Sequence, residues 1–190
     1  MDIKDESILI EKLKDGDHSA FHRLFEEYKK MVFHYAHDLT GNFQEAEDIS
    51  QEVFVRVYNG IKGFRHESSL KTWVMKITLN LCRNYHRRRK ILSFLSLSHE
   101  PQENEDEYSF EISVQDDPAE GIYQRQKLRI LRKTIMKLPR KQREVFVMKH
   151  LKEMKIKEIA EVLGCPEGTV KANLFKAIKN FQTLMKEIEQ

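Results

Sequence analysis

The fold is decided by the segment EIAEVLGCPEGTVKANLFKAIKNFQTLMKEI, residues Glu158–Ile188, which predicts two helices joined by a tight turn. Apolar side chains recur at helical spacing on both sides of the turn. Gly164 suits the left-handed residue that ends a helix, and Pro166 with Glu167 suits the first turn of the next one. The segment therefore has the layout of a helix-turn-helix pair.

The second helix of this pair has two different faces. Val170, Leu174 and Ile178 form an apolar stripe that we expect to pack on the first helix. The side chains that could meet a DNA groove are Glu167, Thr169, Lys171, Asn173, Lys176 and Lys179. In helix-turn-helix proteins, residues near the start of this helix reach base edges, while lysines contact phosphates. An ordinary helical hairpin with a solvated lysine face is the alternative.

The charge is distributed unevenly along the chain and favours DNA binding by its last third. Residues 125–190 contain 17 Lys or Arg and seven Asp or Glu, a net charge of +10. Residues 91–124 contain nine acidic side chains and no Lys or Arg, a net charge of −9. A basic module of this kind is typical of a protein that binds a polyanion.

The composition indicates a helical protein of the cytoplasm. Seven Gly and four Pro in 190 residues, with 33% charged residues, favour long helices and short connections. Cys82 and Cys165 lack CxxC spacing, which predicts thiols in a reducing compartment rather than a disulfide framework. Residues 1–17 are polar, and no apolar run approaches the roughly 20 residues of a membrane helix.

The first half of the chain predicts a second set of helices. Gly41-Asn42 separates two apolar stripes, each of which predicts a helix. Ser68 or Ser69 suits the N-cap of a third helix. On this third helix we expect Trp73 to face the core of the domain rather than its surface. We therefore expect an all-α fold of two small domains. These are an N-terminal helical bundle, residues 1–91, and a C-terminal helix-turn-helix domain of four helices, residues 119–190. Residues 92–118 lack a helical period and predict a flexible acidic linker.

Three motifs in order resemble one family. The segment KEIAEVLGCPEGTVKANLFKAIKNF, residues 157–181, resembles the promoter-binding region of bacterial sigma factors of the extracytoplasmic-function (ECF) type. EAEDISQEVFVRVY, residues Glu45–Tyr58, resembles the polymerase-binding helix of the same family. FRHESSLKTWVMKITLNLCRNYHRRRK, residues Phe64–Lys90, resembles its segment for promoter melting. Together they span residues 45–181 of the 190.

The resemblance implies a sigma factor that brings core RNA polymerase to promoters and helps to open the minus-ten region, without being an enzyme and without a cofactor. Asp48, Gln51 and Glu52 would dock on the clamp of the largest polymerase subunit. The side chains implied for the minus-ten element are Phe64, Ser68, Lys71, Lys76, Asn80, Arg83, Asn84, Arg87 and Arg88. The six polar side chains of the last helix would read the minus-thirty-five element.

The resemblance also implies partners. The acidic linker would thread the RNA exit channel of polymerase, and an anti-sigma protein, often anchored in a membrane, would control the factor.

Two positions depart from the family pattern at turns, because His66 and Glu153 stand where the family often has Gly. Asn173 stands where an Arg is common, and Asn84 where an Asp is common.

The residues also allow two other functions to be considered. A stand-alone helix-turn-helix regulator with a helical ligand or dimer domain is the main alternative. Response regulators carry a similar C-terminal module, but their usual receiver domain would show alternating strands and helices, which are absent from the pattern. For an enzyme, the sequence offers no Gly-rich phosphate loop, nucleophile elbow or carboxylate dyad. Asp48 with Glu52, and His34 with His37, share helix faces, but neither pair is joined by the further ligands of a metal site.

Overall fold

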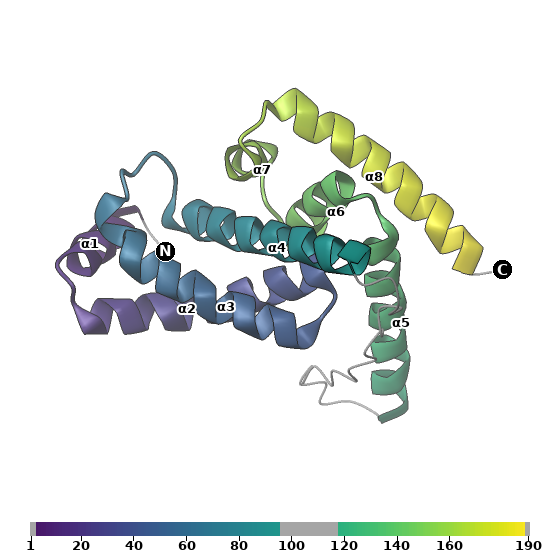
Figure 1. Ribbon diagram of the computed structural model, residues 1–190, viewed down its shortest axis with the longest axis horizontal. Helices are drawn as coiled ribbons and strands as arrows, with labels where there is room; N and C mark the ends of the chain where they lie inside the picture. The colour runs from purple at the N-terminus through teal and green to yellow at the C-terminus, as the bar shows by residue number, and fades with distance from the viewer. Residues whose placement is uncertain (1–2, 96–117, 189–190) are drawn as a thin grey trace.

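The structure, a computed structural model, describes residues 3–95 and 118–188, and this part of the chain folds into helices without any strand. The predicted all-α fold of two helical domains is therefore confirmed (Figure 1). The N-terminal helices are α1 (Ile3–Lys14), α2 (His18–Thr40), α3 (Phe43–Gly60), the short 3-10 helix η1 (Ile61–Gly63) and α4 (Leu70–Leu95). The C-terminal helices are α5 (Pro118–Lys137), α6 (Arg140–Phe146), the π-helix η2 (Val147–Leu151), α7 (Ile156–Leu163) and α8 (Glu167–Ile188).

Local side-chain chemistry explains where the helices begin and end. Asp17 accepts hydrogen bonds from two backbone N–H groups of the first turn of α2, at 2.7 and 3.3 Å. Asn42 caps α3 in the same way, and Ser69, one of the two predicted caps, accepts from the first turn of α4 at 3.1 Å. Gly41 and Gly164 end α2 and α7 in the left-handed conformation, with φ of +70° and +65°.

The N-terminal unit is a bundle in which α2, α3 and α4 pack on one another and α1 covers α2 and η1. The apolar stripes of the three long helices meet in its centre. The fully buried side chains of this core include Leu24, Val32, Tyr35, Val53, Val57, Leu70, Val74 and Leu79.

The C-terminal unit places α8 across α6 and α7, as a helix-turn-helix pair requires. Its core contains Leu138, Val145, Met148, Ile159, Val162, Val170 and Ala177. The chain enters α7 through Glu153, whose φ of +54° lies in the left-handed region that favours glycine. Lys155 then precedes α7, and its backbone N–H donates to Glu158 Oε2 at 2.6 Å.

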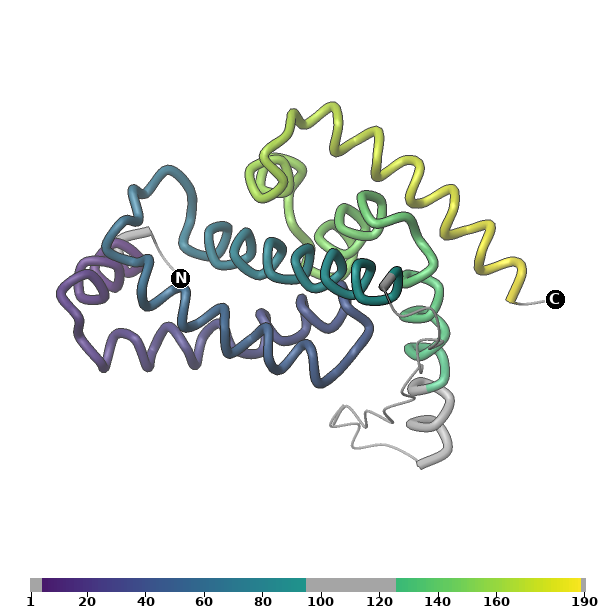
Figure 2. Tube along the Cα trace, viewed as in Figure 1, coloured from purple at the N-terminus to yellow at the C-terminus, as the bar shows by residue number. Residues whose placement is uncertain are grey.

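The two units pack directly against each other. Helix α4 runs through the middle of the molecule, with α2 and α3 on one side and α6 and α7 on the other (Figure 2). Asp38 of α2 accepts from Lys152 at 2.8 Å and lies 3.8 Å from Arg132 of α5. Arg143 Nη1 donates to the Leu39 carbonyl oxygen at 3.2 Å. We call this state, in which the two units are in contact, the closed arrangement. It is stabilised by polar contacts as well as by apolar packing.

The connection between the units lies mostly outside the described residues. Helix α4 continues to Leu95, beyond the predicted end of the first domain at residue 91. Of the acidic linker predicted over residues 92–118, residues 92–95 are helical in α4 and residue 118 begins α5, whereas residues 96–117 lie outside the described residues. Its flexibility there and the domain boundaries stay predictions. Both cysteines are free thiols, Cys82 buried and Cys165 half-buried. No helix in the described part of the chain is both long enough and apolar enough to cross a membrane.

Candidate nucleic-acid and protein interfaces

Helix α8 lies along the outer edge of the molecule (Figure 1). Most of its predicted polar face is exposed to solvent. Of the six predicted side chains, Glu167, Thr169, Lys171, Lys176 and Lys179 are exposed and Asn173 is half-buried. Val170 and Ala177 lie on the opposite, buried face. Asn173 Nδ2 donates to the Thr169 carbonyl oxygen at 2.9 Å, which orients this amide along the helix. The closed arrangement leaves this face accessible.

Phe175 also belongs to this outer face, although the sequence reasoning did not select it. It is 72% exposed and follows Lys171 and precedes Lys179 by one helical turn each. A large aromatic ring on an exposed helix face is costly to leave in water. Its position off the apolar stripe of Leu174 and Ile178 is the signal that could have identified it.

On α4, the predicted DNA side chains form a polar stripe. Lys76, Asn80, Arg83 and Arg87 follow one another at intervals of four, three and four residues, which places them on one helix face. Lys76, Asn80 and Arg87 are exposed, as are Lys71 and Arg88 elsewhere on the helix. Asn84 is half-buried and accepts from Arg87 Nη2 at 3.3 Å.

Arg83 occupies the centre of this stripe but is engaged by the C-terminal unit. Its Nε and Nη2 donate to the two carboxylate oxygens of Glu144 in α6, at 2.9 and 2.7 Å. The Glu144 side chain is 4% exposed, so this bidentate pair is largely withdrawn from water. The hydrogen bond to Glu144 raises the pKa of Arg83. A phosphate could use the Nε–Nη2 edge of Arg83 only after the pair opened.

The loop between η1 and α4 contains the two other predicted minus-ten residues. Phe64 is buried, with its ring 5.1 Å from that of Trp73, so it supports the loop from beneath instead of lying at its surface. Ser68 is half-buried, whereas Arg65 and Glu67 are exposed at the loop tip. Sequence reasoning could not separate the buried from the exposed aromatic positions of a non-helical loop, because such a loop has no periodicity.

The predicted polymerase-binding residues lie on the surface of α3. Asp48, Gln51 and Glu52 are all exposed, and Glu52 accepts from Arg56 Nε at 2.7 Å. Burial, followed by the nearby Asp48 carboxylate, raises the pKa of Glu45 one turn earlier. This part of α3 is therefore an acidic surface that begins close to the helix N-terminus.

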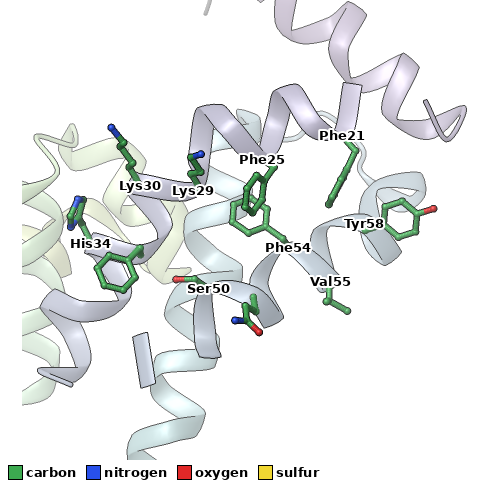
Figure 3. Close-up of a pocket in the computed structure, with 11 residues that line it drawn as sticks. Phe21, Phe25, Lys29, Lys30, His34, Ser50, Phe54, Val55 and Tyr58 are labelled. Carbon is green, nitrogen blue, oxygen red and sulfur yellow. The ribbon is translucent and has the colours of Figure 1, made fainter. Parts of the chain in front are cut away.

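Beside this acidic surface, α2 and α3 enclose an open apolar groove of about 850 Å³ (Figure 3). Phe25 and Phe54 form its floor with ring centroids 4.8 Å apart, and Phe21 contacts Tyr58 at 5.2 Å. Val55 and Tyr58 are about half exposed at its rim. The residues lining it are Phe21, Phe25, Lys29, Lys30, Phe33, His34, Ser50, Gln51, Phe54, Val55 and Tyr58. Gln51 joins the groove to the acidic surface, which sequence reasoning did not foresee.

In the described part of the chain, no metal site forms around the two pairs considered for one, Asp48 with Glu52 and His34 with His37. Burial lowers the pKa of His34 and of His37, and the cations Lys152 and Arg132 act in the same direction. Across residues 3–95 and 118–188, no three His, Cys, Asp or Glu side chains lie close enough together to hold a metal ion. These histidines instead lie near the polar contacts between the two units.

Comparison with known proteins identifies two family regions. Residues 24–91 match the model of Sigma-70 region 2, and residues 128–181 match that of Sigma-70 region 4. The ECF RNA polymerase sigma factor SigW of Bacillus subtilis is 30% identical over 179 residues, which cover 94% of this chain and 96% of that protein. The ECF RNA polymerase sigma-E factor of Haemophilus influenzae is 31% identical, with 89% of each chain covered.

Two solved structures share the fold at 20% identity. CnrH, solved in complex with the cytosolic domain of CnrY, superposes with a TM-score of 0.71 and covers 96% of this chain and 97% of its own. The sigma factor RpoE of Bartonella quintana, solved with the anti-sigma factor NepR, has a TM-score of 0.66 and covers 87% and 96%.

Proposed function

The chain belongs to the ECF family of RNA polymerase sigma factors, non-enzymatic proteins that direct core polymerase to promoters, and we propose that it does so through three separate surfaces. These surfaces are the α2–α3 face for polymerase, the loop and stripe of α4 for the minus-ten element, and the outer face of α8 for the minus-thirty-five element. Initiation on chromosomal promoters would make the cytoplasm its place of action.

The polymerase surface combines the acidic residues of α3 with the adjacent groove. Asp48 and Glu52 supply charge for recognition, while the half-exposed Val55 and Tyr58 supply the apolar area that holds a partner in place. Gln51 lies where the two parts meet. An exposed groove of this size beside a charged surface is what favours a protein partner over a small ligand here.

The minus-ten element would meet the basic stripe of α4. Opening a duplex requires a few kcal/mol for each base that leaves the stack, which must be offset by a pocket for the base and by cations along the strand. Lys76, Asn80 and Arg87 are exposed for the strand, and the loop at residues 65–69 is the candidate base pocket. In the closed arrangement Ser68 is only half-exposed and Phe64 acts from below.

The minus-thirty-five element would meet α8. The observation that carries the proposal is that the polar face of α8 is exposed along its whole first half, while its apolar face is packed on α6 and α7. Thr169 and Asn173 lie near the helix start, where base edges are read, and Lys171, Lys176 and Lys179 suit phosphates. Phe175 suits an apolar contact such as a thymine methyl group.

Binding both elements at once requires the two units to separate. Promoter elements about 25 base pairs apart are roughly 85 Å from each other, whereas α4 and α7 are in contact. A segment as long as the predicted linker reaches at most about 95 Å. We infer that the two units part on polymerase, that the linker then threads the RNA exit channel, and that Arg83 exchanges Glu144 for the nucleic acid.

An anti-sigma protein is a further proposed partner. One of the two fold relatives is a sigma factor solved with its anti-sigma factor, which gives the proposal a precedent of the same shape. Such a protein would act by favouring the closed arrangement or by covering the α2–α3 groove.

Reconstituted transcription tests the function. Purified core polymerase should start transcription at specific genomic sites only when this protein is added. A stand-alone regulator would instead bind DNA equally well without polymerase. The variant Asp48→Lys with Glu52→Lys should lose association with polymerase and keep the DNA affinity of α8. Retention of both activities would refute the assignment of α3.

A further inference from the structure

Helix α1 lies beside η1 and contacts the loop at residues 65–69 through His66, although it precedes the matched region 24–91 (Figure 1). Glu6 Oε1 accepts a hydrogen bond from the backbone N–H of Leu70 at 2.8 Å, across 64 residues of sequence. Leu70 is the first residue of α4, and its N–H is one of the four at a helix start that have no partner within the helix. Glu6 therefore caps a helix to which it does not belong.

A second contact joins α1 to the tip of the loop. His66 has a φ of +58°, a conformation that is unfavourable for any side chain with a Cβ and persists only where the surroundings hold it. Its Nε2 lies 3.5 Å from Lys14 Nζ and 3.8 Å from Glu11 Oε1. On its other side, the His66 ring lies 5.2 Å from the buried Phe64 ring.

The loop is thus held at three points. Phe64 anchors its start against Trp73, α1 flanks its middle at His66, and Glu6 fixes its end at Leu70. Ser69 adds a local cap by accepting from Thr72 N at 3.1 Å. Between these anchors, Arg65 and Glu67 point outward with exposed side chains. The shape that the loop offers to a partner therefore depends on a helix outside the promoter-binding segment.

We propose that α1 is a positioning element for minus-ten recognition, and that Glu6 is the positioning residue that holds the loop in the shape which accepts an unstacked base. Glu6 acts through Leu70 and the loop and does not touch the DNA. This inference rests on the proposed function, because it assigns the loop at residues 65–69 to the minus-ten strand.

The experiment compares promoter preference among variants of the full chain. Transcription by reconstituted polymerase is measured on a panel of promoters in which each minus-ten base is replaced in turn. Glu6→Ala should reduce the preference for the best base at one or more positions by about fivefold, the ratio that corresponds to a helix cap worth about 1 kcal/mol. Glu6→Gln keeps an acceptor oxygen and should retain most of the preference. Asp5→Ala, at an exposed neighbour on the same helix, should behave as the wild type.

A second variant separates positioning from stability. His66→Gly removes the ring contacts with α1 and Phe64, yet glycine adopts a positive φ without penalty, so the chain should unfold at the same or a higher denaturant concentration. Reduced base preference in this stable variant would support positioning. Unchanged preference in both Glu6→Ala and His66→Gly would overturn the inference, as would losses that merely follow polymerase affinity or the unfolding midpoint.

The outcomes distinguish this inference from the proposed function. If the wild type itself starts no promoter-specific transcription, the function fails before α1 is tested. If the wild type is selective and the α1 variants are equally selective, only the role of α1 fails. Binding of an isolated minus-thirty-five duplex should be the same for all variants, since α8 is not involved.

Discussion

The Arg83 guanidinium is clasped by both carboxylate oxygens of Glu144, and this pair joins the long helix of one unit to the second unit of the chain. Glu144 is almost fully buried, whereas the Arg83 side chain is 31% exposed. Asp38 forms a second bridge nearby with Lys152. These contacts give the closed arrangement a specific chemical basis that mutation can remove.

Replacing Glu144 with Gln should open the molecule. The amide keeps the size of the carboxylate but loses the charge that holds Arg83, so we expect a larger radius of gyration by small-angle scattering. Binding of a minus-ten single strand should strengthen in parallel, because Arg83 becomes available. The matched control is Arg140→Ala, since Arg140 contacts Glu144 from within the same helix at 3.8 Å. An unchanged radius in Glu144→Gln would contradict the role of the pair.

Gly41 and Gly16 provide a paired test of the interface. Both have positive φ, +70° and +81°, so Ala at either position should cost about 1–2 kcal/mol of unfolding free energy through backbone strain. An added Cβ at Gly41 would lie 3.0 Å from Met136 of the second unit, whereas nothing lies within 4 Å at Gly16. Gly41→Ala should therefore lower the denaturation midpoint further than Gly16→Ala does, because the Met136 side chain of the second unit must also move by a few tenths of an ångström.

The groove can be tested apart from the acidic surface. Tyr58→Ala removes an aromatic side chain from the rim, and buried aromatic residues commonly dominate protein interfaces. We expect polymerase affinity, measured by competition with a labelled sigma factor, to fall about tenfold or more. Asn59→Ala is the neighbouring control at an exposed position outside the groove lining. Equal affinities for the two variants would exclude the groove from the docking surface.

Phosphate contacts by α8 have a salt signature. Lys176→Ala should weaken binding to all minus-thirty-five sequences about equally and reduce the slope of log affinity against log salt by about one. Phe175→Ala should instead change the preference between sequences with little effect on that slope. Fluorescence anisotropy with duplexes of several sequences at increasing salt distinguishes these outcomes. A slope unchanged in Lys176→Ala would remove this lysine from the contact surface.

Three histidines should make stability depend on pH between 7.5 and 5.5. Burial lowers the pKa of His34, His37 and His86 in the folded chain, whereas in the unfolded chain each has its ordinary pKa of about 6.5. The unfolded state therefore binds more protons as the pH falls through this range, so stability is complete above about pH 6.5 and declines below it.

Denaturant unfolding at the two pH values measures this effect. His37→Gln should reduce the difference between the two unfolding free energies, because it removes one of the three groups. The exposed His22 provides the control substitution, His22→Gln, which should leave the difference unchanged. A midpoint that rises on acidification would show that the sign is wrong.

Helix ends and apolar helix faces could be predicted from the sequence because they depend on interactions within a few residues. The apolar stripes, Gly164 as a left-handed helix end and Ser69 as a cap all depend on neighbours within one or two turns. The two turn positions that depart from the family pattern, His66 and Glu153, are the two non-glycine residues with positive φ in the described part of the chain. The departure therefore marked places where the backbone requires an unusual conformation.

Long-range contacts left no such pattern. Arg83 and Glu144 are 61 residues apart, and Glu6 and Leu70 are 64 apart, so neither pair produces a period in the sequence. Phe64 was predicted to contact DNA from its motif, yet its burial depends on Trp73 from the next helix. The groove between α2 and α3 likewise arises only when two apolar stripes fail to cover each other completely.

The Nε–Nη2 edge of the Arg83 guanidinium can hold only one bidentate partner at a time, and Glu144 occupies it. While Arg83 is paired with Glu144, the second unit competes with the promoter strand for this guanidinium. By reciprocity, whatever strengthens the Arg83–Glu144 pair weakens the binding of Arg83 to the strand. In free molecules the promoter-melting surface of α4 would then be blocked by default, and capture of the opened strand would begin only when polymerase separates the two units.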